Sequence, residues 1–406
     1  MPVGLNVMPK LLPVSGVRVA GVAARLRYKA RPDLVLMVCD DQAVTSAVFT
    51  TNRFAAAPVI IAKKYLAANS PRAWLINAGQ ANAGTGQPGV EIAEQSTACV
   101  AKLIGCQANQ VLPFSTGVIG AAPSLEKIDA ALPQLVAELR EDNWEVAANG
   151  IMTTDTLAKG ASHQVELQGK TVTITGIVKG SGMIHPNMAT MLGFVATDAA
   201  IEKPVLDQCW QEVAAKTFNR ITVDGDTSTN DAAVIFATGR AENPIIASVA
   251  SEDYQQLKDS LYNVCAMLAQ SIIRDAEGAT KFVTVTVSGG ASEADCLEIA
   301  FTIAHSPLVK TALFASDPNW GRILAAVGRA PVQNLDINKV DLYLDEVCVA
   351  SGGAIDVDYT EEKGQSVMNQ EEIEIRVLLH AGEAEARVWT SDLSHEYVRI
   401  NAEYRS

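Results

Sequence analysis

Residues 179–194 read Lys-Gly-Ser-Gly-Met-Ile-His-Pro-Asn-Met-Ala-Thr-Met-Leu-Gly-Phe, and they lead from one strand through a turn into a second, apolar strand. The turn contains two glycines and Pro186, residue types that permit a sharp and strained backbone. The spacing alone favours an ordinary connection between two neighbouring strands.

The same turn also admits a chemical interpretation. In a strained backbone the hydroxyl of Thr190 can attack the carbonyl carbon of Ala189, and hydrolysis of the resulting ester makes Thr190 a new N-terminus. Its α-amine, with an ordinary pKa of about 7.7 to 8.0, then acts as a general base beside the hydroxyl. On this interpretation the chain contains an N-terminal nucleophile.

Short runs of apolar and β-branched residues, bounded by turn residues, predict strands on both sides of this segment. They cover residues 34–39, 46–50, 58–62, 74–77, 171–178, 232–237, 282–287, 340–350 and 373–379. Apolar residues that recur every three or four positions predict helices over residues 91–103, 125–139, 205–217 and 253–274. This order predicts stacked layers of helix and sheet, an α/β (α+β) fold, instead of regular βαβ winding.

The composition is that of a soluble globular chain of 406 residues. Its formal net charge of -14 argues against a surface for nucleic acid or anionic membrane, because both need clustered Lys and Arg. Seven cysteines without a C-x-x-C pair predict reduced, buried side chains, and the five scattered histidines lead us to assign no metal. No stretch approaches the roughly 18 apolar residues of a membrane-spanning helix, and no signal peptide is evident, so we expect a cytoplasmic protein.

A Gly-x-Gly-x-x-Gly sequence is formed by Gly84, Gly86 and Gly89, between a predicted strand and a predicted helix. This is the context of a dinucleotide-binding loop. Pro88 stiffens the loop, however, and no Asp or Glu follows about 20 residues later to hold a ribose hydroxyl. A plain Gly-rich turn is the favoured interpretation, and a nucleotide-binding module is the alternative.

Seven further sequence blocks, spread along nearly the whole chain, are read together with residues 179–194. They are Thr-Asn-Arg-Phe-Ala-Ala-Ala-Pro-Val at 51–59, Asn-Ala-Gly-Gln-Ala-Asn-Ala at 77–83, Ser-Thr-Gly-Val-Ile-Gly at 115–120, Met-Thr-Thr-Asp-Thr at 152–156, Val-Asp-Gly-Asp-Thr-Ser-Thr-Asn-Asp at 223–231, Ser-Asp-Pro-Asn-Trp-Gly-Arg at 316–322 and Arg-Ile-Asn-Ala-Glu-Tyr-Arg-Ser at 399–406. Together with residues 179–194, they resemble the ornithine acetyltransferase family, the glutamate N-acetyltransferases of the cyclic arginine pathway.

The resemblance implies a fold of stacked sheets and helices, similar in mechanism to the N-terminal nucleophile hydrolases but distinct in topology. It also implies self-cleavage between Ala189 and Thr190, which gives two intertwined fragments, residues 1–189 and 190–406. Family members typically assemble from two copies of each fragment, so we expect a heterotetramer.

The resemblance further assigns roles to individual residues. Thr190 is the implied nucleophile, and Thr116 and Gly117 form the implied oxyanion hole, where a hydroxyl and an amide approach the developing charge closely. The implied substrate contacts are Thr153, Lys179, Thr190, Glu277, Asn401 and Ser406. Among these, Lys179 suits an amino-acid carboxylate and Glu277 suits the ornithine amine.

The implied reaction transfers acetyl from N2-acetylornithine to Thr190 and then to glutamate, which gives ornithine and N-acetylglutamate in arginine biosynthesis. No cofactor is implied. Some family members also accept acetyl-CoA as a co-substrate, and we expect a bifunctional enzyme of this kind. The alternatives are a monofunctional ornithine acetyltransferase and a threonine hydrolase or aminopeptidase, in which water takes the acyl group.

Overall fold

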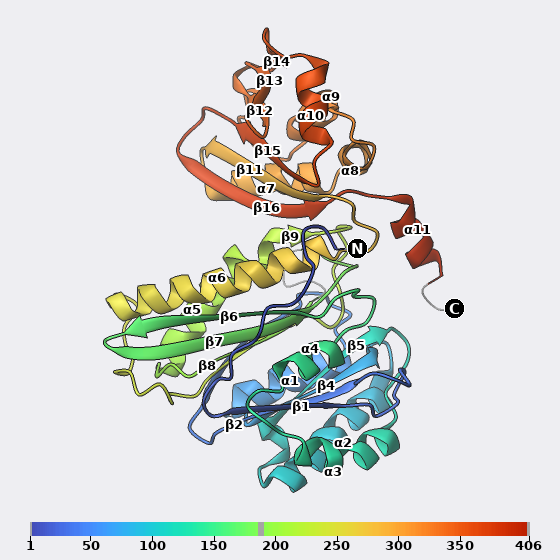
Figure 1. Cartoon of the computed structure of the whole chain (residues 1–406), viewed down its shortest axis with the longest axis vertical. Coiled ribbons are helices and arrows are strands. Elements are labelled where there is room, and N and C mark those ends of the chain that lie inside the picture. The colour runs from blue at the N-terminus through green and yellow to red at the C-terminus, as the bar shows by residue number, and fades with distance from the viewer. Residues whose placement is uncertain (1, 186–190, 404–406) are drawn as a thin grey trace. The chain divides into compact units, whose positions relative to one another are not determined.

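The computed structural model describes residues 2–185 and 191–403, which form two compact units (Figure 1). The larger unit comprises Val7–Asn219 and Asp226–Ile272. The smaller unit comprises Met1–Asn6, Arg220–Gly225 and Ile273–Ser406. Both units mix helices with sheets, so the predicted α/β (α+β) class is confirmed.

The larger unit contains two sheets. One has the order β1 (Val17–Val22), β2 (Leu34–Cys39), β4 (Ala73–Gln80) and β5 (Val111–Val118). The other has the order β3 (Val44–Phe49), β10 (Ala232–Ala237), β8 (Leu192–Thr197), β7 (Lys170–Lys179) and β6 (Lys159–Leu167). Strand β8 is central because it pairs antiparallel with β7 and parallel with β10.

The two sheets pack face to face through aromatic side chains. Trp74 of β4 stacks on Phe236 of β10 with ring centroids 3.5 Å apart, and Phe114 of β5 meets Phe194 of β8 edge to face at 5.2 Å. These rings lie within one buried core that also takes in α1 (Ala57–Ala68) and α4 (Trp144–Gly150). These contacts pack β4 and β5 of the first sheet against β10 and β8 of the second.

The outer faces of these sheets are covered by helices. A separate buried core joins the first sheet to α2 (Gly86–Ile104) and α3 (Leu125–Ala137). The second sheet carries α5 (Lys203–Lys216) and α6 (Glu252–Arg274), as Figure 1 shows. The indole of Trp210 in α5 donates to the carbonyl of Ala233 at 2.9 Å, which fixes that helix to β10. The larger unit is thus layered as helix, sheet, sheet and helix.

The smaller unit is built on one seven-stranded sheet. Its order is β14 (Ala354–Ile355), β13 (Val347–Ser351), β12 (Asp341–Leu344), β15 (Glu372–Leu378), β11 (Phe282–Gly290), β16 (Ala384–Ser391) and β9 (Ile221–Thr222). The helices of this unit are α7 (Glu293–Ala304), α8 (Pro307–Phe314), α9 (Trp320–Gly328), α10 (Glu361–Met368) and α11 (His395–Ala402). Helices α7 to α10 share a buried core with the sheet, whereas α11 buries none of its side chains.

Two predicted strands are wrong. Residues 58–62, predicted as a strand, lie in helix α1, because Pro58 occupies the start of a helix, where its missing N–H is not needed. Residues 340–350, predicted as one strand, form the hairpin β12–β13, since Asp345 adopts a positive φ of 47° and turns the chain. The four predicted helices each lie on an observed helix, with bounds that differ by a few residues.

Candidate active site

Three polar side chains from separate segments of the larger unit meet at one ammonium group. Lys179, the last residue of β7, donates from Nζ to Thr116 Oγ1 at 3.1 Å and to Thr153 Oγ1 at 2.8 Å. Lys179 and Thr116 are buried, and Thr153 is half-buried. The structure therefore brings together three of the residues that the resemblance singled out.

The turn that carries Thr116 requires glycine at two positions. Gly117 and Gly79 face each other where β5 and β4 end, with φ of 128° and 118°, and both angles fall where only glycine is unstrained. A Cβ on Gly117 would lie 2.3 Å from the carbonyl carbon of Gly79. The close approach of these two backbones fixes the position of the turn.

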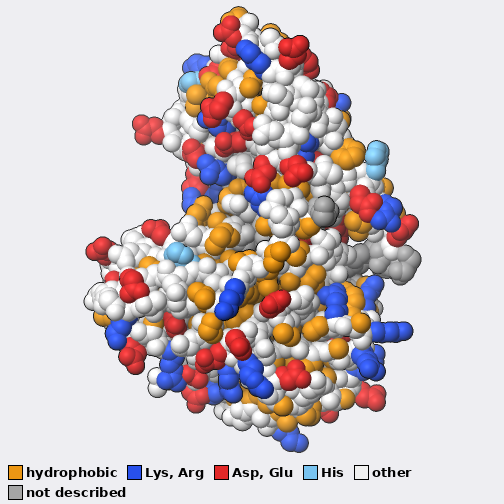
Figure 2. All heavy atoms as spheres, viewed as in Figure 1, with side chains coloured by type: hydrophobic (Ala, Val, Ile, Leu, Met, Phe, Trp, Pro, Cys, Tyr) orange, Lys and Arg blue, Asp and Glu red, His pale blue; other side chains and the backbone are white. Residues whose placement is uncertain are grey.

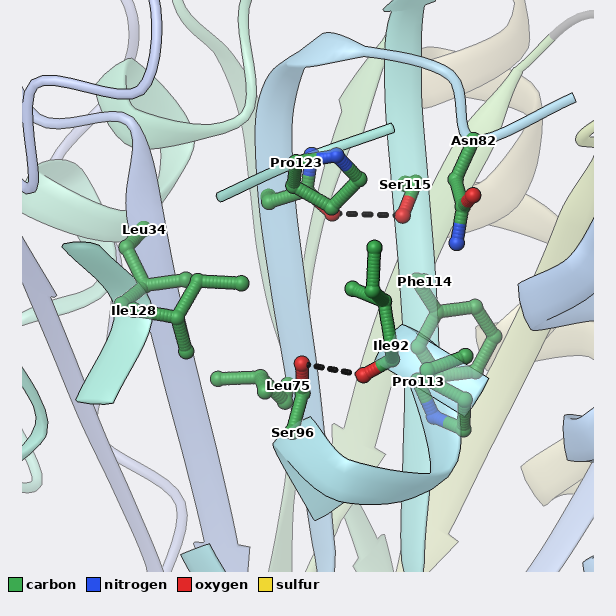
Figure 3. Close-up of a pocket in the computed structure, with 12 residues that line it drawn as sticks. Leu34, Leu75, Asn82, Ile92, Ser96, Pro113, Phe114, Ser115, Pro123 and Ile128 are labelled. Atoms are coloured by element: carbon green, nitrogen blue, oxygen red, sulfur yellow. Dashed lines mark hydrogen bonds between the residues drawn. The ribbon is translucent and has the colours of Figure 1, made fainter. Parts of the chain in front are cut away.

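Side chains behind this turn anchor its backbone. Ser115 Oγ donates to Asn77 Oδ1 at 2.5 Å, and Asn230 Nδ2 donates to the carbonyls of Ser115 at 2.9 Å and Ala81 at 2.6 Å. Asn77 and Ser115 also line a cavity of about 10 Å³ whose other walls are mostly apolar (Figure 3). This volume is near the least that holds one water. Because Thr116, Thr153 and Lys179 do not line it, the cavity is not the meeting point of the candidate site.

The loop that carries Thr153 is also anchored. The guanidinium of Arg31 donates to the carbonyls of Met152 at 2.9 Å and Asn149 at 3.2 Å, and it lies 3.6 Å from the centre of the Tyr28 ring. These contacts hold the backbone on one side of Thr153 and so restrict the position of its hydroxyl.

Asp155 lies beneath the site and was not predicted. Its Oδ2 accepts from the N–H of Thr153 at 2.9 Å, and its Oδ1 accepts from the N–H of Gly180 at 2.8 Å and from Lys159 Nζ at 2.7 Å. Burial acts to raise the pKa of this carboxyl, but the ammonium groups of Lys159 and Lys179 outweigh that effect and hold the pKa well below its usual range. Asp155 is therefore ionised at neutral pH.

Two further predicted residues are bonded to each other within the smaller unit. Asn401 Nδ2, on α11, donates to Glu277 Oε2 at 2.8 Å. Helix α11 is fastened nearby, because Tyr397 Oη donates to Asp224 Oδ2 at 3.0 Å and Ser394 Oγ donates to the carbonyl of Gly278 at 2.6 Å. Glu277 is buried, which is uncommon for a carboxylate without a partner, and Asn401 supplies one here.

Ala189, Thr190 and Ser406 lie outside the described residues. Strand β8 begins at Leu192, which pairs with Lys179 across β7 and β8. Leu192 is the second residue after position 190, so the described chain resumes beside the backbone of Lys179.

Two residues that the sequence analysis missed lie inside blocks that it quoted. Asp155 belongs to the block at 152–156, and Asn230 belongs to the block at 223–231. Lys159, four residues after Asp155, gave the one further signal, because opposite charges at that spacing are often paired.

The Gly84 loop is closed by groups of the chain itself. Thr85 Oγ1 donates to Asn82 Oδ1 at 2.8 Å, and Asn82 Nδ2 donates to the carbonyl of Gly89 at 2.9 Å. A Cβ on Gly89 would lie 1.9 Å from Thr85 Oγ1, so this glycine serves the packing of the turn. These contacts favour the plain Gly-rich turn over the dinucleotide-binding loop.

Neither a grouped set of metal-ligating side chains nor a membrane-spanning helix is found in the part of the chain that the structure describes. Across residues 2–185 and 191–403, no three His, Cys, Asp or Glu side chains are grouped to hold a metal ion. Within the same ranges, no helix is long and apolar enough to cross a membrane.

All seven cysteines are free; Cys39, Cys209, Cys265 and Cys296 are buried, and the other three are half-buried. On the face shown in Figure 2, acidic and basic side chains are interspersed.

Comparison with known proteins gives full-length matches. Residues 18–406 match the ArgJ family. The chain is 55% identical over 406 residues to the arginine biosynthesis bifunctional protein ArgJ of Pseudomonas fluorescens (strain Pf0-1), and 52% identical over 406 residues to the protein of that name from Pseudomonas syringae pv. tomato, with all of each chain covered. The crystal structure of the arginine biosynthesis bifunctional protein ArgJ from Bacillus halodurans is 38% identical, with a TM-score of 0.51 over 52% of this chain and 99% of that one.

Proposed function

This chain belongs to the ArgJ family, and we propose that it moves an acetyl group from N2-acetylornithine to glutamate through an ester on Thr190. The observation that carries this proposal is the bonding of Lys179 to the hydroxyls of Thr116 and Thr153. An ammonium and two hydroxyls at one point suit a substrate that has both a carboxylate and a reacting carbonyl group.

We propose Thr190 as the nucleophile because Leu192, two residues later in the chain, pairs with the end of β7. Leu192 pairs with Lys179, and consecutive Cα atoms are about 3.8 Å apart, so covalent geometry limits how far residue 190 can be from the end of β7. Cleavage before Thr190 would supply an α-amine whose ordinary pKa is near 8, which suits a general base at neutral pH.

The first half-reaction then follows from the proposed roles. The α-amine of Thr190 takes the proton of its own hydroxyl, and the oxygen bonds to the acetyl carbon of N2-acetylornithine. The negative charge that develops on the acetyl oxygen is met by the hydroxyl of Thr116 and the N–H of Gly117. When the C–N bond breaks, the ornithine amine leaves with the proton. The second half-reaction reverses these steps with the amine of glutamate as the attacking group.

Lys179 has a specific effect on the proposed oxyanion hole. A hydroxyl both accepts and donates hydrogen bonds, and Thr116 Oγ1 accepts from the ammonium of Lys179. The hydroxyl hydrogen of Thr116 can therefore be donated to another acceptor. The adjacent positive charge makes this hydroxyl a stronger donor. We propose that this acceptor is the acetyl oxygen in the transition state.

Cleavage is tested by a denaturing mass spectrum of the purified protein. We expect pieces of about 20 and 23 kDa in place of the 43.1 kDa chain. The variant Thr190→Ala should stay whole, and Thr190→Ser, which keeps a hydroxyl, should be cleaved at least in part. An intact wild-type chain that still transfers acetyl would refute the N-terminal amine as the base.

The ester is tested by incubating the enzyme with N2-acetylornithine alone. One acetyl group should appear on the fragment that begins at Thr190, together with one ornithine per site, and added glutamate should remove it. Initial rates should give parallel double-reciprocal lines. Intersecting lines without labelling of that fragment would instead mean direct transfer between two bound substrates.

Acetyl-CoA is the second donor that we propose, because both full-length relatives are named bifunctional proteins. N-acetylglutamate should form from acetyl-CoA and glutamate without ornithine compounds. Failure of that reaction would leave the monofunctional ornithine acetyltransferase. Ornithine release that glutamate does not accelerate would favour the hydrolase or aminopeptidase.

We also propose that the processed protein is cytoplasmic and assembles as two copies of each fragment. Light scattering on a size-exclusion column should then give about 86 kDa, twice the mass of one chain. A mass near 43 kDa would contradict the tetramer.

A further inference from the structure

The connection between β1 and β2 carries a run of basic side chains in a chain that is acidic as a whole. Arg25, Arg27, Lys29 and Arg31 alternate with uncharged residues, and no Asp or Glu occurs before Asp33, although the formal net charge is -14. The side chains at positions 25, 27 and 29 are exposed. This connection therefore presents positive charge to solvent.

The backbone of the connection is held in one conformation. Oδ2 of the buried Asp33 accepts from the N–H groups of Leu26 at 2.7 Å, Arg27 at 3.1 Å and Tyr28 at 3.3 Å. Three hydrogen bonds to one carboxylate oxygen are charge-assisted and fix the path of these residues. The exposed basic side chains thus start from an ordered backbone, which lowers the entropy cost of binding a ligand.

The connection lies against the strand ends that form the proposed oxyanion hole. Gln80 Nε2 donates to the carbonyl of Leu26 at 2.9 Å. A Cβ on Gly79 would lie 2.5 Å from Cβ of Arg27, so the stem of Arg27 packs on the end of β4. Gly79 is in turn paired with Gly117 of β5. Positive charge therefore adjoins the place where we propose that the acetyl group is transferred.

We propose that Arg25, Arg27 and Lys29 bind the phosphate groups of acetyl-CoA. This inference rests on acetyl-CoA as the second donor, proposed above. Guanidinium groups donate paired N–H bonds that match the oxygens of a phosphate, and an ammonium adds a compact charge. The phosphates of CoA are separated from its thioester by the pantetheine arm, so their site belongs beside the acetyl-transfer centre and outside it.

Helix α3 adds a further cation at this surface. Nζ of the exposed Lys127 donates to the carbonyl of Arg25 at 2.8 Å. N2-acetylornithine has no phosphate and would not use these side chains. The connection is therefore specific for one of the two proposed donors, and this difference is what the experiment measures.

The test begins with the double variant Arg25→Gln and Lys29→Gln, which removes two charges and leaves the contact with Gly79 intact. In the synthesis of N-acetylglutamate from acetyl-CoA and glutamate, its KM for acetyl-CoA should rise about tenfold, with a smaller change in kcat. Arg27→Gln keeps the three carbons that lie against Gly79 and should raise this KM about threefold. An unchanged KM in the folded and cleaved double variant would overturn the inference.

Two other donors separate a phosphate site from damage to the acetyl-transfer centre. The KM of the double variant for N2-acetylornithine should stay within about twofold of the wild-type value, because this donor has no phosphate. S-acetylpantetheine is a thioester without the phosphates of CoA, and its KM should be the same in the wild type and the double variant. Equal losses with all three donors would overturn the inference.

A matched control lies at the start of β7, away from Lys179. Lys170 is half-exposed and pairs with Glu242 at 3.5 Å, so Lys170→Gln removes one exposed positive charge as Lys29→Gln does. Its KM for acetyl-CoA should equal that of the wild type. A rise as large as that of Lys29→Gln would mean that the net charge of the chain sets the affinity, and would overturn the inference.

Binding is measured apart from turnover by calorimetric titration with CoA. The double variant should bind CoA about tenfold more weakly than the wild type. If the wild type binds CoA but transfers no acetyl group from N2-acetylornithine, the proposed function fails, and the affinities of the variants still decide the inference. If it transfers acetyl from N2-acetylornithine but does not bind CoA, the inference is overturned and that transfer stands. Should the double variant not fold, Lys29→Gln replaces it, with an expected loss of about threefold.

Discussion

The backbone of Gly117 approaches that of Gly79 so closely that a Cβ on Gly117 would lie 2.3 Å from the Gly79 carbonyl carbon. This contact joins the ends of β5 and β4 where the proposed oxyanion hole is formed. A side chain cannot be accommodated here, because the three atoms that it would meet, the carbonyl carbon, the oxygen and the Cα of Gly79, all belong to the backbone.

Gly117→Ala should therefore destabilise the protein by about 2 to 5 kcal/mol, from the strained φ and the backbone clash together. The measurement is urea unfolding. Gly120→Ala is the matched control, since Gly120 also has a positive φ of 87° but nothing lies within 4 Å of its added Cβ. That variant should lose only about 1 kcal/mol. Equal losses in the two variants would show that the clash contributes nothing.

Thr116→Ala should slow acetyl transfer by about 10-fold to 1000-fold and change KM much less, because an oxyanion donor acts mainly in the transition state. Thr116→Ser keeps the hydroxyl that accepts from Lys179 and should recover most of the rate. Both variants must first be shown to be cleaved. Normal turnover in cleaved Thr116→Ala protein would remove Thr116 from the site.

Asn401→Ala should raise the KM for N2-acetylornithine about tenfold, because it removes the hydrogen bond that orients Glu277. Unfolding should be almost unchanged, since α11 buries none of its side chains. Arg399→Ala on the same helix is the control, because Arg399 forms ion pairs with the exposed Glu396 and Glu403. Deletion of residues 401–406 should also weaken substrate binding more than folding. Full activity in the truncated protein would exclude the helix end from the site.

The contribution of Lys310 to stability should rise with pH, because this lysine is buried in the smaller unit, where it donates to Thr390 Oγ1 at 3.0 Å. Burial lowers the pKa of Lys310 to about 8, against the opposing effect of Asp392 and Asp224. An unfolded lysine has a pKa near 10.4, so between pH 8 and pH 10 residue 310 binds more proton in the unfolded chain than in the folded one, and its contribution makes unfolding less favourable. Below pH 8 Lys310 is protonated in both the folded and the unfolded chain, so the full free-energy cost of burying its charge lowers the stability.

The size of that penalty is about 3 kcal/mol, from a pKa difference of roughly 2.4. The difference in unfolding free energy between wild type and Lys310→Met, measured at several values from pH 7.5 to pH 10, should therefore grow in favour of the wild type. Titrations elsewhere in the chain cancel in this difference. A difference that stays constant with pH would show that Lys310 keeps an ordinary pKa.

Local patterns in the sequence predicted much of the fold, and their failures have physical causes. The apolar run at 58–62 has no clear period, so a strand and a buried helix look alike, and only Pro58 indicated the start of a helix. The break at Asp345 was missed because a non-glycine residue with positive φ is uncommon and leaves little trace in composition.

The site was accessible to sequence analysis only through the family blocks. Thr116, Thr153 and Lys179 are separated by many residues, and no periodicity indicates that β5, the loop after α4 and β7 end at one point. Asp155 and Lys159 had a recognisable spacing, but a pair four residues apart is usually a solvated surface pair. Burial, which distinguishes this one, is a property of the packed sheets and is absent from the local sequence.

The strand order of the second sheet has a consequence for the processed enzyme. Strands β3, β7 and β6 precede position 190, whereas β8 and β10 follow it, so the order β3-β10-β8-β7-β6 encloses two strands of one proposed fragment between strands of the other. After cleavage, neither fragment can therefore separate from the other while the sheet is intact. Once unfolded, however, the two pieces must find each other again, and recovery changes from a first-order to a second-order process. Dilution should leave the folded enzyme untouched but slow its return from denaturant, with a half-time that grows as the concentration falls.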